Sequence, residues 1–182
     1  MCLFPSVSYS LNEIGLVPIS ILSTITDFSL LLLSKNTTFL PLIEGIKCVA
    51  HPDPTDGFGL GKLIDEYKAT IMFGTSTFYR LYTKNPKVNK TMFTSIRLAV
   101  AGAEKLRDEV RVDFKNKFEK EILEGYGTSE TSPVVACNIP DTLAIDGSIQ
   151  VGSKKGSVGM PIPGTIIKIV DPDTFKELAT GE

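Results

Sequence analysis

From residue 46 onward, hydrophobic and polar positions repeat with two different periods. Four short apolar runs, each bounded by turn-forming residues, predict strands at residues 46–50, 69–74, 95–102 and 121–127. Three stretches between them repeat apolar residues every three or four positions, which predicts helices at residues 58–68, 75–85 and 105–118. A later apolar run, residues 165–172, predicts a strand that opens a further β-rich region.

The helical repeats also predict which side chains face the core. In the third helix, Val110 and Phe114 are four residues apart and share one apolar face. In the second helix, the spacing places Phe78, Leu81 and Tyr82 on one face.

The order of these elements predicts the fold class. Strands that alternate with helices are typical of an α/β fold with a largely parallel sheet flanked by helices. Ligands of such sheets bind beyond the carboxyl ends of the strands. Three of the predicted strands end in turns with the sequences FGTST, AGAEK and GYGTSE. We expect these turns to lie side by side along one rim of the sheet.

The N-terminal segment does not continue this pattern. Residues 14–33 are apolar over a length that could span a bilayer, but Pro18 and Asp27 interrupt them. No basic residue precedes the apolar run, so the segment does not resemble a signal peptide. The open interpretations are a membrane segment, a part of the buried core, or a poorly ordered end.

Composition and charge narrow the classes of function. The net charge is −2 over 182 residues, which argues against a nucleic-acid partner. The three cysteines form no pair with zinc or redox spacing, as expected of reduced thiols in a cytosolic protein. His51 is the only histidine, so a catalytic triad or a histidine-rich metal site would depend on it alone.

The densest group of candidate binding residues lies in EGYGTSETSP, residues 124–133. Glycines on both sides of Tyr126 let the backbone pass close to a ligand, and the tyrosine ring can cover the face of a base. The Ser129 hydroxyl and the turn amides suit a phosphate, while Glu130 offers an oxygen ligand for Mg²⁺. These features together suit a nucleotide. The alternative is a turn whose serine and glutamate cap a helix.

Three further motifs each have a binding and a structural interpretation. In VAGAEKL, residues 100–106, small residues leave room for the edge of a base, or form an ordinary turn with Glu104 near a helix start. In FGTSTFYRLY, residues 73–82, the aromatic side chains form an acyl-binding wall or simple core. GSVGMPIPG, residues 156–164, is a rigid wall beside a site or a loop between subdomains.

The motifs GTST, AGAEKL, EGYGTSE and GSVGMPIPG occur in the order typical of adenylate-forming (AMP-binding) enzymes. Residues 39–182 resemble the central part of the N-terminal domain of that superfamily, whereas the apolar N-terminal segment, residues 1–38, does not align. Within the superfamily, the stretches FLPLIEGIKCVAHPDPTD and EGYGTSE look most like bacterial phospholipid-repair enzymes. Those enzymes are 2-acylglycerophosphoethanolamine acyltransferase/acyl-acyl-carrier-protein synthetases.

The resemblance implies an ATP- and Mg²⁺-dependent ligase. A fatty acid and ATP would form an acyl-adenylate and pyrophosphate. The acyl group would then pass to the thiol of acyl carrier protein or CoA, or onward to a lysophospholipid. The implied location is the cytoplasm, or the inner face of the cell membrane.

The resemblance also implies that the phosphate loop of the family precedes this region, and that its catalytic C-terminal domain follows it. We therefore expect the 182-residue chain to be a fragment that is inactive by itself. The alternative is an inactive remnant, or a binding module of the same fold.

Roles carry over to the matching positions. The resemblance implies that Tyr126 stacks on adenine, that Ser129 and Glu130 are catalytic, and that Glu130 holds the metal ion. The residues implied to bind the nucleotide are Gly102, Ala103, Glu104, Gly125, Tyr126, Gly127, Thr128 and Ser129. Those implied to line the acyl and thiol channel are Thr75, Ser76, Gly159 and Gly164.

Overall fold

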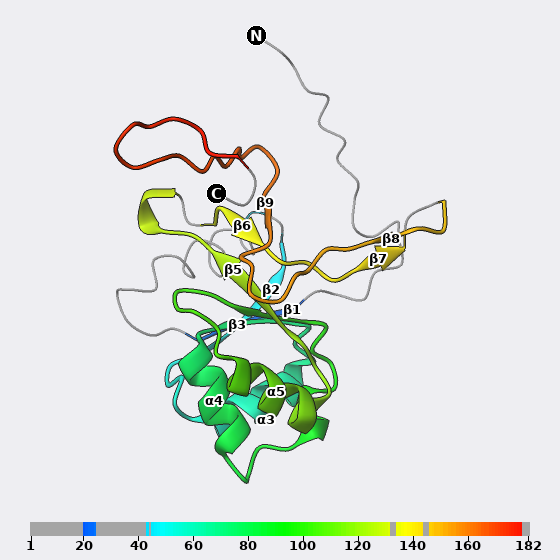
Figure 1. The fold of residues 1–182 in the computed structure, drawn as a ribbon. Coiled ribbons are helices and arrows are strands. Elements are labelled where there is room, and N and C mark those ends of the chain that lie inside the picture. The colour runs from blue at the N-terminus through cyan, green and yellow to red at the C-terminus, as the bar shows by residue number, and fades with distance from the viewer. Residues whose placement is uncertain (1–19, 25–42, 44, 132–133, 144–145, 180–182) are drawn as a thin grey trace.

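A seven-stranded sheet forms the centre of the protein in the computed structural model, which describes residues 20–24, 43, 45–131, 134–143 and 146–179. The strand order is β2-β1-β3-β4-β5-β6-β9 (Figure 1). The first five strands in this order run parallel, and β6 and β9 add on antiparallel. The strands are β1 (Ser20–Thr24), β2 (Lys47–His51), β3 (Ile71–Gly74), β4 (Leu98–Ala101), β5 (Ile122–Tyr126), β6 (Ala136–Cys137) and β9 (Met160–Pro161). The predicted α/β fold with a largely parallel sheet is confirmed.

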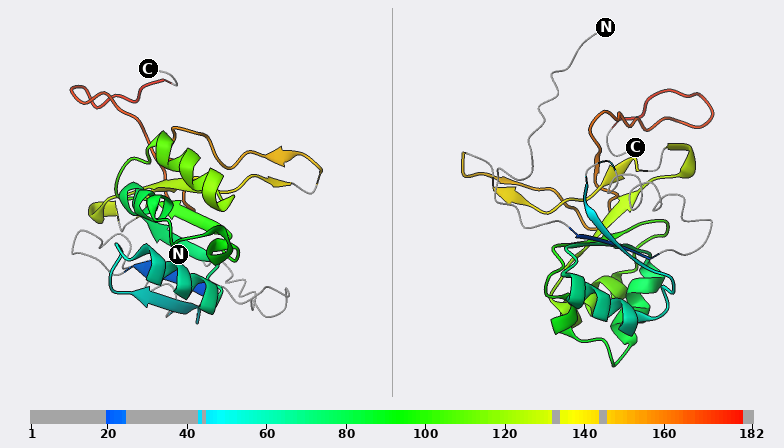
Figure 2. Two further views of the ribbon diagram at one scale, coloured as in Figure 1. Left: turned by 90° about the horizontal axis from the view of Figure 1, so that it is seen from below. Right: turned by 180° about the vertical axis from the view of Figure 1, so that it is seen from behind.

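Three helices lie together on one face of the sheet (Figures 1 and 2). They are α3 (Gly57–Tyr67), α4 (Ser76–Lys84) and α5 (Asp108–Phe118), and short 3₁₀ turns occupy Lys90–Phe93 and Ser129–Thr131. Each helix follows a strand, so the predicted alternation is confirmed. Helix α3 begins at Asp56, whose carboxylate accepts a hydrogen bond from the Gly59 N–H at 2.9 Å.

The buried face of α5 matches its sequence pattern, whereas that of α4 differs by one residue. Val110 and Phe114 on α5 are buried, as predicted. On α4, Tyr79 and Tyr82 are buried and Phe78 packs against the core, whereas Leu81 is 42% exposed. Tyr79 faces the sheet because its hydroxyl donates to the carbonyls of Met72 at 3.3 Å and Val100 at 3.0 Å.

The N-terminal apolar stretch contributes a strand to the sheet. Residues 20–24 form β1, which lies between β2 and β3 and aligns Ile21 with both Cys48 and Ile71. The rest of residues 14–33 lies outside the described residues. In the part of the chain that the structure describes, no helix is long and apolar enough to cross a membrane. The domain boundary between residues 38 and 39 stays a prediction.

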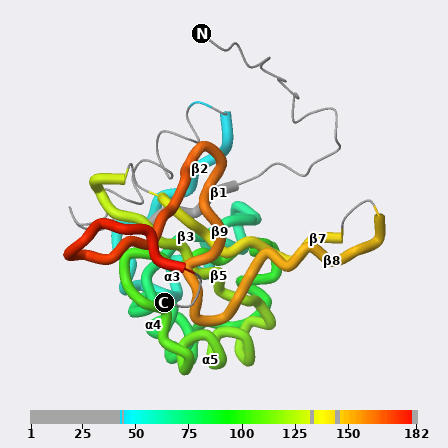
Figure 3. Tube along the Cα trace, turned by 45° about the horizontal axis from the view of Figure 1, so that its top comes forward, coloured from blue at the N-terminus to red at the C-terminus, as the bar shows by residue number. Residues whose placement is uncertain are grey.

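The described residues after 133 form short strands, of which only β6 and β9 belong to the seven-stranded sheet. Strands β7 (Thr142–Leu143) and β8 (Ile149–Gln150) form a two-stranded arm that projects from the body (Figure 2). The strand predicted at residues 165–172 is wrong, because this segment has only one isolated bridge, between Val170 and Glu177. In Figure 3 the C-terminal end of the described chain is a loop, drawn in red. The Asp171 carboxylate accepts from the Thr174 N–H at 2.7 Å, which turns the chain back on itself after a single bridge.

Candidate functional site

The turns after β3, β4 and β5 lie next to one another along one edge of the sheet. These strands are neighbours and run parallel, so their carboxyl ends point the same way. The pairing of β3 with β4 continues into the turn, because the Gly102 N–H donates to the Gly74 carbonyl at 3.1 Å. The predicted rim of three turns is therefore confirmed.

Hydroxyl side chains after β3 bind backbone N–H groups, one of them on the turn after β4. Thr75 caps α4, since its hydroxyl accepts from the Phe78 N–H at 3.4 Å. Ser76 is buried, and its hydroxyl accepts from the Arg107 N–H at 3.2 Å. The roles implied for Thr75 and Ser76 in an acyl channel stay predictions, but both hydroxyls already bind within the protein.

Glu104 closes the same junction from the other side. Its carboxylate accepts from the Thr77 N–H at 2.6 Å, so it interacts with the N-terminus of α4 rather than that of the helix that follows it. Partial burial alone raises the pKa of Glu104, but it is outweighed by hydrogen bonds from Thr77 and Thr75 and by the charge of Arg107. Together they hold the pKa below its ordinary value of 4.5.

This lowered pKa predicts that Glu104 contributes to acid sensitivity. A carboxyl group whose pKa is lower in the folded than in the unfolded protein adds to the free energy of unfolding at pH values above its ordinary pKa. This contribution disappears as the pH falls through the pKa of the folded protein. We expect the difference in free energy of unfolding between the wild type and Glu104→Gln to be full at about pH 7 and to shrink below about pH 4.5. Urea unfolding followed by circular dichroism measures it. A difference that stays constant down to about pH 3 would contradict the assignment.

The end of β5 presents Tyr126 at the rim. Tyr126 pairs with Ala136 on β6, and its carbonyl accepts from the Val135 N–H at 2.9 Å. These bonds hold its backbone, while its side chain belongs to the exposed large hydrophobic groups. A ring that is held at its base and open on its face is suited to stacking on a flat ligand.

The loop after Tyr126 forms a short 3₁₀ turn at Ser129–Thr131. Thr131 closes the turn, because its hydroxyl accepts from the Thr128 N–H at 3.0 Å and donates to the Thr128 carbonyl at 2.9 Å. Thr131 thus supplies hydrogen bonds that close the turn, and the side chains of Ser129 and Glu130 are exposed.

Glu130 suits a metal ion that the protein shares with a ligand. Its own backbone N–H and the Thr128 hydroxyl lower the pKa of Glu130, so the carboxylate is ionised at neutral pH. Within the described ranges, no three histidine, cysteine, aspartate or glutamate residues form a cluster that could hold a metal. Mg²⁺ is often bound by one or two carboxylates together with substrate phosphates, and this arrangement fits that mode.

The backbone between β4 and α5 leaves room for a ligand. A methyl group built on Gly102 would meet only the Gly125 carbonyl oxygen, at 3.9 Å. Ala103 adopts the left-handed conformation with φ of +67°, which turns the chain sharply at this point. Of the implied nucleotide-binding residues, Gly102 after β4 and Gly125 on β5 thus lie next to each other, and the Cβ direction of Gly102 is open.

The two channel glycines have separate structural roles. Gly159 has φ of +88°, and a Cβ atom there would overlap the backbone of Cys137 and Asn138. Gly164 has φ of +86° and lies in a Pro-Gly turn, which the Thr165 N–H closes by donating to the Ile162 carbonyl at 3.0 Å. Neither observation tests a place in a channel, so that role stays a prediction.

The chain is similar to known proteins over most of its length. The family model described as AMP-binding enzyme matches residues 19–182. The long-chain-fatty-acid–CoA ligase of Salmonella typhimurium is 31% identical over 130 residues, which cover 71% of this chain and 21% of that protein. The chain thus spans about a fifth of the length of this curated relative.

Solved structures share the fold. A benzoate CoA ligase from Burkholderia xenovorans LB400 superposes with a TM-score of 0.73 at 20% identity, over 93% of this chain and 32% of that one. ATP-bound MatB from Rhodopseudomonas palustris superposes with a TM-score of 0.63 at 23% identity, over 90% of this chain and 30% of that one. At these identities the likeness concerns the fold alone.

Proposed function

Because the chain belongs to the AMP-binding enzyme family, we propose that it forms one wall of an ATP and acyl-adenylate site. One observation supports this proposal. The Gly102 turn (residues 102–107) and the Tyr126 loop (residues 126–131) are adjacent at the carboxyl ends of β4 and β5. Main-chain atoms beside open space lie on one turn, and an exposed aromatic ring lies on the next.

The residues of this wall divide the work of holding a nucleotide. The ring of Tyr126 stacks on adenine, while the backbone of Gly102 and Ala103 borders the edge of the base. The Ser129 hydroxyl contacts a phosphate oxygen, and Glu130 holds Mg²⁺. When bound, Mg²⁺ neutralises charge on the phosphates as the carboxylate of the acid substrate approaches the α-phosphorus. The remaining nucleotide-binding residues of the proposal are Glu104, Gly125, Gly127 and Thr128.

The whole protein would activate a fatty acid. ATP and the acid form an acyl-adenylate and pyrophosphate, and the acyl group then passes to a thiol with release of AMP. The name of the Salmonella relative supports a long-chain fatty acid as substrate and CoA as acceptor. Acyl carrier protein or a lysophospholipid at the inner face of the membrane is the alternative acceptor, which rests on the finer sequence resemblance alone.

Binding of ATP to the 182-residue chain tests the proposal. We expect isothermal titration with MgATP to show binding that weakens about fivefold in Tyr126→Leu, because stacking of aromatic rings contributes about 1 kcal/mol. Tyr67→Leu is the matched control, since Tyr67 is 52% exposed on α3 and Tyr126 is 49% exposed. Equal losses in both variants would contradict stacking at Tyr126.

The metal role of Glu130 is tested in the same titration, repeated with and without Mg²⁺. In the wild type Mg²⁺ should strengthen ATP binding, and Glu130→Ala should remove most of that gain. A wild-type chain that binds no ATP would refute the proposal for this chain and favour the inactive alternative.

A further inference from the structure

A buried carboxylate on β5 ties the turn after β4 to the Tyr126 loop. The side chain of Glu124 is only 13% exposed and lies two residues before Tyr126. One carboxylate oxygen accepts from the Leu106 N–H at 3.1 Å, and the other lies 3.2 Å from Nη2 of Arg111. Arg111 also donates to the Ile122 carbonyl at 2.9 Å, so the guanidinium is anchored to β5 at two points.

The turn that Glu124 holds is also bound on its other side. Glu104 accepts from the Thr77 N–H at 2.6 Å, and the Arg107 N–H donates to the Ser76 hydroxyl at 3.2 Å. The segment between β4 and α5 is therefore hydrogen-bonded on one side to the turn after β3. On the other side, towards Tyr126, it is hydrogen-bonded to Glu124 on β5.

The backbone of Glu124 extends these links to the fourth motif. Its carbonyl accepts from both the backbone N–H and the side-chain amide of Asn138, each at 2.9 Å. Asn138 is buried, accepts from the Lys154 N–H at 2.9 Å and donates to the Ser157 carbonyl at 2.8 Å. One continuous network of hydrogen bonds thus joins the four motifs. The sequence assigned no role to Glu124, although it opens the EGYGTSE motif, and it did not indicate Asn138.

The Glu124 carboxylate has no obvious substitute in this network. Removing it leaves the Leu106 N–H and part of the Arg111 guanidinium unpaired in a partly buried place, which is costlier than losing an exposed ion pair. Nε of Arg111 is already buried without a hydrogen-bond partner within the described part of the chain. The turn would then be held only from the β3 side.

We propose that Glu124 is a positioning residue. Its carboxylate holds residues 102–107 at a set distance from the Tyr126 loop, so that both sides of the base site keep their spacing. The consequence for ATP rests on the proposed function, whereas the mechanical coupling does not.

Amide hydrogen exchange and MgATP affinity, measured on the full chain, test this assignment together. In Glu124→Ala we expect exchange across residues 102–107 to accelerate about tenfold, and ATP to bind about tenfold more weakly. Glu124→Gln keeps a carbonyl that can accept from the Leu106 N–H, and should restore most of the protection. Glu121→Ala is the matched control, because that exposed carboxylate pairs only with exposed Lys115 among the printed ion pairs of the described residues. Protection of the Phe114 amide reports whether the fold as a whole has loosened.

Each outcome decides either the positioning role of Glu124 or the proposed function of the chain. Unchanged exchange at residues 102–107 in Glu124→Ala would overturn the positioning role, whatever happens to ATP. Faster exchange with unchanged ATP affinity would also overturn it, because the turn would then be irrelevant to the site. Faster exchange in a chain whose wild type binds no ATP would leave the coupling standing and refute the proposed function.

Discussion

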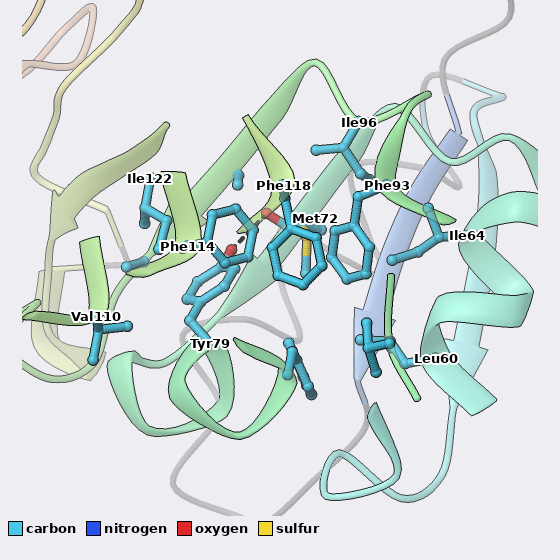
Figure 4. Packing of buried hydrophobic residues seen from close by; sticks show 14 of the residues in the cluster. Leu60, Ile64, Met72, Tyr79, Phe93, Ile96, Val110, Phe114, Phe118 and Ile122 are labelled. Atoms are coloured by element: carbon cyan, nitrogen blue, oxygen red, sulfur yellow. Dashed lines mark hydrogen bonds between the residues drawn. The ribbon is translucent and has the colours of Figure 1, made fainter. Parts of the chain in front are cut away.

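Replacing Phe114 with alanine is expected to lower the free energy of unfolding by about 3–5 kcal/mol. Phe114 is fully buried on α5, where α4, α5 and the Lys90–Phe93 turn meet beneath the sheet (Figure 4). Its ring centroid lies 5.1 Å from that of Tyr79, 6.0 Å from that of Phe93 and 4.8 Å from that of Phe118. The substitution removes three aromatic contacts at once. It also leaves a cavity between α4, α5 and the Lys90–Phe93 turn, and these elements cannot move separately to fill it.

Urea unfolding of the wild type and two variants measures this loss. Val112→Ala lies on the same helix but is 52% exposed, so we expect a change within about 0.5 kcal/mol. A loss below about 1 kcal/mol in Phe114→Ala would mean that this aromatic cluster does not hold the helices as the structure shows.

Replacing Gly159 with alanine is expected to cost about 3 kcal/mol and to loosen β9 from β6. The left-handed backbone there disfavours any side chain, and a methyl group would also overlap the Cys137 and Asn138 backbone. Backbone atoms cannot rotate away as a side chain can, so the strain is relieved only if β9 moves off β6. Cys137 pairs with Met160 between these strands, so we expect its side chain to become more exposed to solvent.

Gly156→Ala separates the two costs. Gly156 has φ of +77°, but a Cβ atom there meets nothing within 4 Å, so this variant has only the backbone cost of about 1 kcal/mol. Thiol labelling followed by mass spectrometry provides the second measurement. Burial raises the pKa of the Cys137 thiol, which slows labelling, and exposed Cys48 is the internal reference. Equal stability and equal labelling of Cys137 in the two variants would rule out the backbone overlap.

Periodicity predicted the regular elements well. The strands now called β2, β3, β4 and β5 and all three helices lie where short apolar runs and helical repeats placed them. The exceptions have causes in the tertiary structure. β1 has the composition of a generic apolar segment and becomes a strand only between two others, while residues 165–172 lack a neighbouring strand within the described region. On α4, Tyr79 rather than Leu81 faces inward because strand carbonyls receive its hydroxyl.

The chemistry of the candidate site was only partly readable in the sequence. Tyr126, Ser129 and Glu130 stand out because glycines, hydroxyls and an acid gather in a few residues. The role of Glu124 does not stand out although it opens that motif, and Asn138 lies outside all four motifs, since an acid in a strand and an amide after one carry no local signal of a partner. Their partners, Leu106, Ser157 and others, come from distant parts of the chain.

The sequence by itself therefore determined the alternation of strands and helices, the position of the turns at the strand ends and the types of side chain that those turns carry. These properties depend on neighbours within about four positions, through periodicity and turn chemistry. Only the tertiary structure decided the strand order, the inward face of α4 and the use of Glu104 and Glu124 as links between turns. Those outcomes depend on which groups, far apart along the chain, meet when the sheet is assembled and their buried polar atoms must be paired.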